Sequence, residues 1–179
     1  MAGAHEFVDE TKTPGRYILA ATAIDPTDLP TVRSQLRSWR VRGSSSIHFT
    51  NEKDSTRRAL LSRMVDLPVA VRLYVIEGRA REAVARDLAM SRLAEGVLVR
   101  GSQRLVLERD DSMARGDRQQ LARRFRAEPQ PPSYVHLRAR EEPLLWVSDA
   151  VAWCHQRGGV WPVLCERLVV EVVRIDATK

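Results

Sequence analysis

Cysteines, lysines and long hydrophobic runs are all scarce in this sequence. Its two cysteines, Cys154 and Cys165, are too few for a disulfide framework, so we expect a reduced setting. The first residues lack a basic segment followed by an apolar one, so no secretory signal is expected and the cytoplasm is the predicted location. No run of about 18 apolar residues occurs, which argues against a membrane-spanning helix.

The positive charge comes almost entirely from arginine. Basic residues number 29 against 23 acidic ones, a net charge of +6, and the lysines are Lys12, Lys53 and Lys179. The arginine guanidinium can donate two hydrogen bonds to one phosphate group, which predicts nucleic acid as a partner. Alternatively, the arginine content reflects a GC-rich genome, which favours arginine codons. The predicted phosphate-binding residues are Arg37, Arg40, Arg42, Arg115, Arg118, Arg138 and Arg140.

The order of the predicted elements indicates an α/β fold. We expect a single domain over residues 1–179. A strand at 5–10, a turn at 11–15 and a strand at 16–24 predict an amino-terminal antiparallel hairpin. Further strands are expected at 69–76, 105–108 and 134–137, with a short extended segment at 47–49. Helices are expected near 32–42, 55–67, 79–99, 117–126 and 144–155, whereas 168–175 reads as either helix or strand. The alternation predicts a mixed sheet with helices on both faces.

Acidic residues gather where two predicted strands end. Asp9 and Glu10 close the first strand, and Glu108 closes a later one. Asp149 lies inside an apolar helix, an unfavourable position for aspartate. If Asp9, Glu108 and Asp149 converge, their repulsion calls for a cation, and Mg²⁺ or Mn²⁺ is the natural choice for oxygen ligands. Carboxylates that hold two such ions support phosphoryl transfer.

Neighbouring residues extend this predicted site, and each has a simpler alternative. Glu10 and Glu52 are further candidate metal ligands, and His48 is a candidate proton relay. Alternatively, Glu10 is solvated or paired with Lys12, and His48 is a hydrogen-bonded structural residue. Asp110 and Asp111, after the acidic strand end, are most simply helix N-caps or turn formers. His136 is expected to be structural or to lie at the surface.

Several short segments resemble a known family. The segments are Phe7-Val8-Asp9-Glu10 before an apolar strand, Ile47-His48-Phe49, and the helix that carries Ser148-Asp149-Ala150. Over about residues 5–157 they resemble a large bacterial family of domains of unknown function with a ribonuclease-H-like fold (the DUF-3800 type). The resemblance implies that fold, with Asp9, Glu108 and Asp149 as metal ligands and His48 as the family's histidine.

The chain departs from that family pattern at two positions. Thr11 replaces the serine that follows Asp9 and Glu10, which is a mild change. Ser46 stands where the family has a glutamate before the histidine, which removes one ligand unless Glu52 replaces it.

Three functions follow from these observations. The first is a metal-dependent nuclease with Asp9, Glu108, Asp149, His48 and Glu52 at its site. The second is a catalytically inactive module of the same fold that binds nucleic acid or a protein. The third is a small-molecule phosphohydrolase that uses the same acids.

Overall fold

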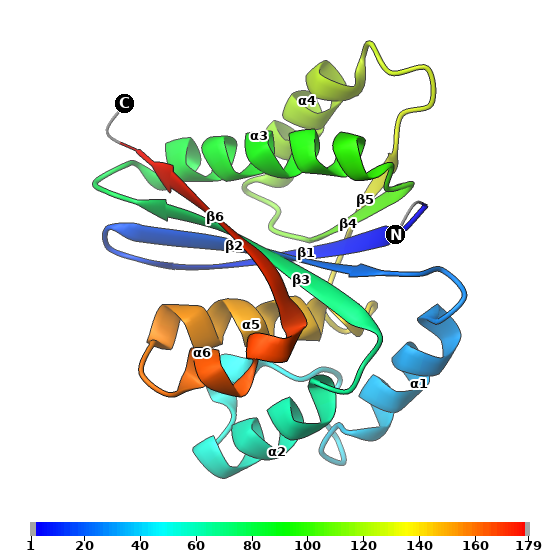
Figure 1. Ribbon diagram of the computed structural model, residues 1–179, viewed down its shortest axis with the longest axis vertical. Coiled ribbons are helices and arrows are strands. Elements are labelled where there is room, and N and C mark those ends of the chain that lie inside the picture. Colours follow the sequence, from blue (N-terminus) through cyan, green and yellow to red (C-terminus); the bar gives the residue numbers. More distant parts are fainter. Residues whose placement is uncertain (1–2, 178–179) are drawn as a thin grey trace.

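One six-stranded mixed sheet runs through the molecule, with helices on both faces (Figure 1). The computed structural model describes residues 3–177. The strands are β1 (His5–Thr13), β2 (Arg16–Ile24), β3 (Val69–Glu77), β4 (Arg104–Glu108), β5 (Ser133–Leu137) and β6 (Val169–Asp176). The helices are α1 (Leu29–Ser38), α2 (Asp54–Met64), α3 (Glu82–Arg100), α4 (Ala114–Phe125), α5 (Leu144–Arg157) and α6 (Trp161–Leu164), and the 3-10 helices are η1 (Phe49–Asn51) and η2 (Glu166–Leu168).

The strand order is β5-β4-β1-β2-β3-β6. β2 pairs antiparallel with both β1 and β3, whereas the β1–β4, β4–β5 and β3–β6 pairs are parallel. The expected α/β architecture with an antiparallel hairpin and parallel flanking strands is therefore confirmed. The undecided carboxy-terminal segment is strand β6, because it pairs with β3 along most of its length.

Each face of the sheet has its own apolar core. On one face, residues such as Phe7, Ile18 and Leu73 pack with the α5 residues Trp146 and Val147. On the other face, Val8, Leu19 and Tyr74 pack with Met90 and Leu93 of α3. In Figure 1, α3 and α4 lie on one side of the sheet and α1, α2, α5 and α6 on the other. Adjacent strand residues alternate between these two faces.

Two local expectations were wrong. The first strand does not end at Glu10 but continues to Thr13, because Thr11 to Thr13 pair with β2, and the turn is Pro14-Gly15. Gly15 has φ of 80°, a left-handed value that favours glycine. The segment at 47–49 is not a strand, since Phe49 begins the 3-10 helix η1.

Within residues 3–177, no helix combines the length and the hydropathy that crossing a membrane requires.

Candidate functional site

The sheet register brings Asp9 beside Glu108. Val8 of β1 pairs with Leu107 of β4 in parallel, so the next residue on each strand is one of the two acids. Phe7 of β1 and Val106 of β4 pack in the core under α5. Asp9 lies two residues after Phe7, and Glu108 lies two residues after Val106. Side chains two positions apart in a strand point to the same face, so both carboxyls face α5. Asp9 is only 6% exposed.

Helix α5 supplies the third carboxyl. The Ser148 hydroxyl donates to the Phe7 carbonyl oxygen at 2.8 Å and lies 2.7 Å from the Thr22 hydroxyl, which holds α5 against β1 and β2. The following residue, Asp149, is partly buried, and its carboxylate accepts a hydrogen bond of 2.8 Å from the Phe49 backbone N–H. Asp149 therefore also anchors η1, a contact that no local pattern around Asp149 predicts.

The pKa values of Asp9 and Asp149 show that the three acids interact. Burial raises the pKa of Asp9 well above its usual range, and a hydrogen bond with the Glu108 carboxyl and the charges of Glu108 and Asp149 raise it further. Burial also raises the pKa of Asp149 to about 6; the charge of Glu108 acts in the same direction, against the Phe49 hydrogen bond and His48. Like charges in a poorly solvated place favour proton uptake or a bound cation.

Every other buried carboxylate has an arginine partner. Glu6 accepts from Arg100 at 2.9 Å, Glu142 from Arg33 at 2.6 Å and Asp117 from Arg86 at 2.8 Å. Across residues 3–177, neither Asp9, Glu108 nor Asp149 forms an ion pair with a lysine or arginine. Within residues 3–177, Asp9 is therefore the buried carboxyl that has neither an arginine nor a lysine as a partner.

The three carboxyls do not form a ready-made metal cage. In the part of the chain that the structure describes, no group of three or more His, Cys, Asp or Glu side chains is placed to hold a metal ion. The donor chemistry nevertheless suits a hard cation, because Mg²⁺ is usually held by one or two carboxylates and keeps several water ligands. Asp9 and Glu108 are the neighbouring pair that fits this mode.

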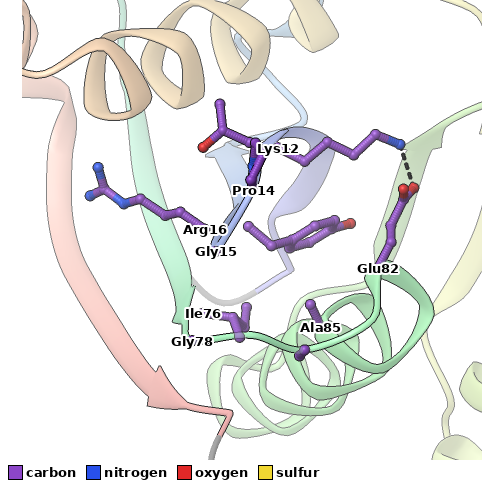
Figure 2. Close-up of a pocket in the computed structure, with 11 residues that line it drawn as sticks. Lys12, Pro14, Gly15, Arg16, Ile76, Gly78, Glu82 and Ala85 are labelled. Carbon is purple, nitrogen blue, oxygen red and sulfur yellow. Dashed lines mark hydrogen bonds and ion pairs between the residues drawn. The ribbon is translucent and has the colours of Figure 1, made fainter.

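Glu10 does not lie with Asp9, because successive strand residues face opposite sides of the sheet. Its carboxylate pairs with Arg86 of α3 at 2.7 Å, under the other face. The expected alternatives, solvation or pairing with Lys12, were wrong, since Glu10 is only 14% exposed and Lys12 pairs with Glu82 (Figure 2).

A buried charge network surrounds Arg86. The guanidinium donates to both carboxylate oxygens of Asp117 and to the Tyr17 hydroxyl, and Asp117 also lies 3.0 Å from His136 Nε2. His136 is thus structural, as expected. The sequence-based reasoning did not identify this network, although strand alternation already placed Glu10 on the α3 face.

The remaining predicted site residues lie at the periphery. His48 is exposed and acts on Asp149 through its charge. Glu52 follows η1, and within residues 3–177 no hydrogen bond or ion pair joins its side chain to the three acids. Asp110 is a turn former, as expected, because it accepts from the backbone N–H and the hydroxyl of Ser112.

An open notch of about 540 Å³ lies where β4 ends and β1 continues. It is lined by the β1 segment from Asp9 to Lys12, which includes Glu10, by Glu108, and by the turn that precedes α4. α4 begins at Ala114 from this turn, so the exposed Arg115 and Arg118 lie beyond the notch. Arg138 directly follows Leu137, the β5 partner of Glu108, and reaches within 3.8 Å of Asp111.

The arginines near α1 are placed differently. Arg37 and Arg42 are exposed, but Arg40 donates to the carbonyl oxygens of Arg37, Ser44 and Ser45 and thereby ties the end of α1 to the next loop. Arg140 is exposed after β5.

Comparison with known proteins identifies the fold. No family model matches the sequence, and no curated protein matches it. The solved structures do include similar chains, among them one from the structure of the PCNA:RNase HII complex from Archaeoglobus fulgidus. That match has 12% sequence identity and a TM-score of 0.54, and it covers 88% of this chain and 73% of the other. The chain thus has a ribonuclease-H-like fold.

Proposed function

We propose that this protein is a metal-dependent nuclease that hydrolyses phosphodiester bonds at the notch beside Asp9 and Glu108. The observation that carries this proposal is the contrast among the buried acids: Glu6, Asp117 and Glu142 each have an arginine, whereas Asp9 has one backbone N–H and other carboxyls beside it. Burying an uncompensated carboxylate is costly, so a chain that keeps this arrangement gains from a cation that joins it there.

The named residues have distinct tasks in this proposal. Asp9 and Glu108 hold the cation, Mg²⁺ or Mn²⁺, and Asp149 adds negative charge from α5. When bound, the ion polarises a phosphodiester oxygen and lowers the pKa of water. Exposed Arg115 and Arg118, on the helix that begins after the notch, and exposed Arg138, which reaches Asp111 at its rim, contact phosphates along the nucleic acid. The fold of an RNase HII complex chain agrees with a role on nucleic acid.

The test is cleavage of labelled single-stranded DNA, RNA, duplex DNA and RNA–DNA hybrid in Mn²⁺ and in Mg²⁺. Asp9→Asn removes a ligand charge without changing size and is expected to slow cleavage at least about a hundredfold, since metal ions contribute several kcal/mol to such reactions. Asp66→Asn, at a carboxyl that is 71% exposed, is the matched control and should cleave like the unmodified protein. Equal rates for the unmodified protein and Asp9→Asn on every substrate would refute the proposal.

A second candidate is a non-catalytic nucleic-acid-binding module. The observation in its favour is that Asp149 is already engaged by the Phe49 N–H, while Ser46 stands where the resembling family has an acid. Calorimetry separates the two candidates: a nuclease takes up Mn²⁺, and Asp9→Asn loses that uptake. Salt-sensitive nucleic-acid binding without Mn²⁺ uptake would select the binding module.

A further inference from the structure

Arg57 lies close to the start of α2, where a positive charge is unfavourable because the amino-terminal end of a helix is itself electropositive. Its side chain is nevertheless only 12% exposed. One nitrogen donates to Asp54 in the first turn of α2 at 2.6 Å, which balances the charge. The rest of the guanidinium reaches back beyond the end of the helix to the turn η1, so the position of Arg57 serves contacts outside α2.

Two nitrogens of this guanidinium bind the backbone of η1. Nε donates to the Phe49 carbonyl oxygen at 2.8 Å, and Nη2 donates to the Thr50 carbonyl oxygen at 2.7 Å. Arginine suits two neighbouring carbonyls because its donors are held rigidly in one plane. The Phe49 oxygen also accepts from the Glu52 N–H at 3.3 Å. The turn is therefore held both by its own backbone and by Arg57.

Arg57 also joins η1 to α5, the helix that carries Asp149. Its guanidinium carbon lies 4.2 Å from the centre of a Trp153 ring, which is a cation–π contact. The Trp153 and Phe49 rings meet edge to face, with their centres 5.3 Å apart. Trp153 follows Asp149 by four residues, or about one helical turn, so both side chains lie on the same side of α5. Phe49 contacts both of them, one with its ring and the other with its backbone N–H.

These contacts connect Arg57 with the acidic site. Arg57 binds the carbonyl oxygen of Phe49, and the N–H of the same residue donates to the Asp149 carboxylate at 2.8 Å. A carboxylate turns about its side-chain torsions, and a well-aligned donor favours one orientation over the others. The orientation of the Asp149 carboxyl, the α5 member of the acidic site, therefore depends on where η1 is held.

The next residue along α2 provides a natural comparison. Arg58 also lies over a tryptophan, with its guanidinium carbon 5.1 Å from the centre of a Trp161 ring. Arg58 is exposed, and within residues 3–177 no hydrogen bond joins it to η1. The two arginines thus share a helix, a charge and an aromatic neighbour, and differ in their contacts with the η1 backbone.

We propose that Arg57 is a positioning residue that fixes the Asp149 carboxyl at the acidic site through the backbone of η1. Within residues 3–177, Arg57 forms its ion pair with Asp54 and none with Asp9, Glu108 or Asp149, so it acts through another group. The expected effect on cleavage rests on the proposed nuclease function. The expected effect on the hydrogen bond between Phe49 and Asp149 is independent of any activity.

Hydrogen exchange of the Phe49 amide, followed by NMR, measures this hydrogen bond directly. Arg57→Gln loses the charge and the planar donors, and should speed that exchange at least about tenfold because η1 opens more often. Arg57→Lys keeps the charge but cannot bind both carbonyls in the same way, and should have a smaller effect. Arg58→Gln is the matched control and should leave the exchange unchanged. Unchanged exchange of the β2 amides shows that each variant is compared in its folded state.

Cleavage measures the consequence at the site. Arg57→Gln should lower kcat about ten- to a hundredfold with little change in KM, because a displaced group near the reacting atoms slows the reaction without weakening substrate binding. Arg57→Lys should recover part of the rate. Arg58→Gln should cleave like the unmodified protein. A residue that only stabilised the fold would instead lower the fraction of folded protein, which urea unfolding measures.

The inference is overturned if Arg57→Gln leaves the exchange of the Phe49 amide unchanged, or if Arg58→Gln speeds it equally. It is also overturned if Arg57→Gln cleaves normally in a protein that loses cleavage with Asp9→Asn. If Arg57→Gln does not fold, Arg57→Lys and Arg58→Lys provide the same comparison. Failure of the nuclease proposal is a separate result, because the Phe49 amide still shows whether Arg57 fixes Asp149 in a protein that never cleaves.

Discussion

Buried carboxylates in this protein occupy two kinds of environment, and the difference lies in single side chains. Glu6 receives Arg100 and the Ser102 hydroxyl, and Asp117 receives Arg86 and His136. In both cases donors replace the hydrogen bonds that water would otherwise give to the carboxylate. Asp9 receives one backbone N–H, from Glu10, and otherwise faces acids. Burying a carboxyl with a single donor is unfavourable for folding, and in our proposal a bound cation offsets that cost.

Asp117 provides a pH-dependent test of the arginine-paired environment. Burial alone would raise the pKa of Asp117, but hydrogen bonds from Arg86 and His136 outweigh it and lower the pKa to about 2. A lowered pKa in the folded state contributes stability above the ordinary value of 3.8, and this contribution is lost as the pH falls toward 2. Asp117→Asn should therefore lower the free energy of unfolding at pH 6. The difference in this free energy between the variant and the unmodified protein should be smaller by about 1 to 2 kcal/mol at pH 2.5.

Urea unfolding at a series of pH values measures this effect. Asp66→Asn, at an exposed carboxyl, is the control for the general loss of one negative charge. A difference in the free energy of unfolding between Asp117→Asn and the unmodified protein that stays constant from pH 6 to pH 2.5 would contradict the claim that Arg86 and His136 lower the pKa of Asp117.

At the level of elements, α5 and the β1–β2 hairpin determine where the acids meet. The hairpin extends beyond the end of β4, so Asp9 lies at the edge of a notch although it is in the middle of its own strand. α5 contributes Asp149 because Ser148, the residue before it, is bonded to both β1 and β2. A serine in the middle of an apolar helix thus acts as the attachment of that helix to the sheet.

The attachment can be measured with a double-mutant cycle. Ser148→Ala leaves the buried Thr22 hydroxyl and the Phe7 carbonyl without this partner and should cost about 1 to 3 kcal/mol in the free energy of unfolding. Thr22→Val removes the other hydroxyl, and the two changes together should cost less than their sum by about 0.5 kcal/mol or more. Ser62→Ala, at an exposed serine of α2, should change stability by less than about 0.5 kcal/mol. Strict additivity would show that the Ser148–Thr22 contact contributes nothing.

At the level of the whole molecule, the net charge of +6 matters through its distribution. Several arginines compensate buried acids, namely Arg33, Arg86 and Arg100, and these are not available to a polyanion. Arg115 and Arg118 on α4 are exposed, and the helix that carries them starts at the rim of the notch. The surface that meets nucleic acid in our proposal is therefore more restricted than the arginine content suggests.

The salt dependence of nucleic-acid binding tests this distribution. Each lysine or arginine that neutralises a phosphate contributes about 0.7 to the slope of log K against log salt for single strands and about 0.9 for duplex DNA. Arg115→Ala and Arg118→Ala should each lower the slope by about that amount. Arg63→Ala, on the exposed side of α2, should leave the slope unchanged. Equal slopes for all variants would place the phosphate contacts elsewhere.

Periodicity and local residue preferences were enough to predict most of the architecture. Strand β3 and helices α3 and α5 follow from apolar patterns in their own residues, and the hairpin follows from two apolar runs joined at Pro14-Gly15. The convergence of Asp9 with Glu108 was also predictable in outline, because both are acids at the ends of expected strands. The partner of Glu10 was not, since Arg86 lies 76 residues away along the chain and nothing local specifies that pairing.

Local patterns thus established the α/β class, the positions of the main elements and the acids worth testing, because each depends on neighbours within a few residues. The three-dimensional arrangement established which buried acids pair with an arginine, that Asp9 does not, and that Asp9 and Glu108 line the same notch. Those properties depend on strand register and on which helix covers which face of the sheet, and both arise from packing between segments that are distant in the sequence.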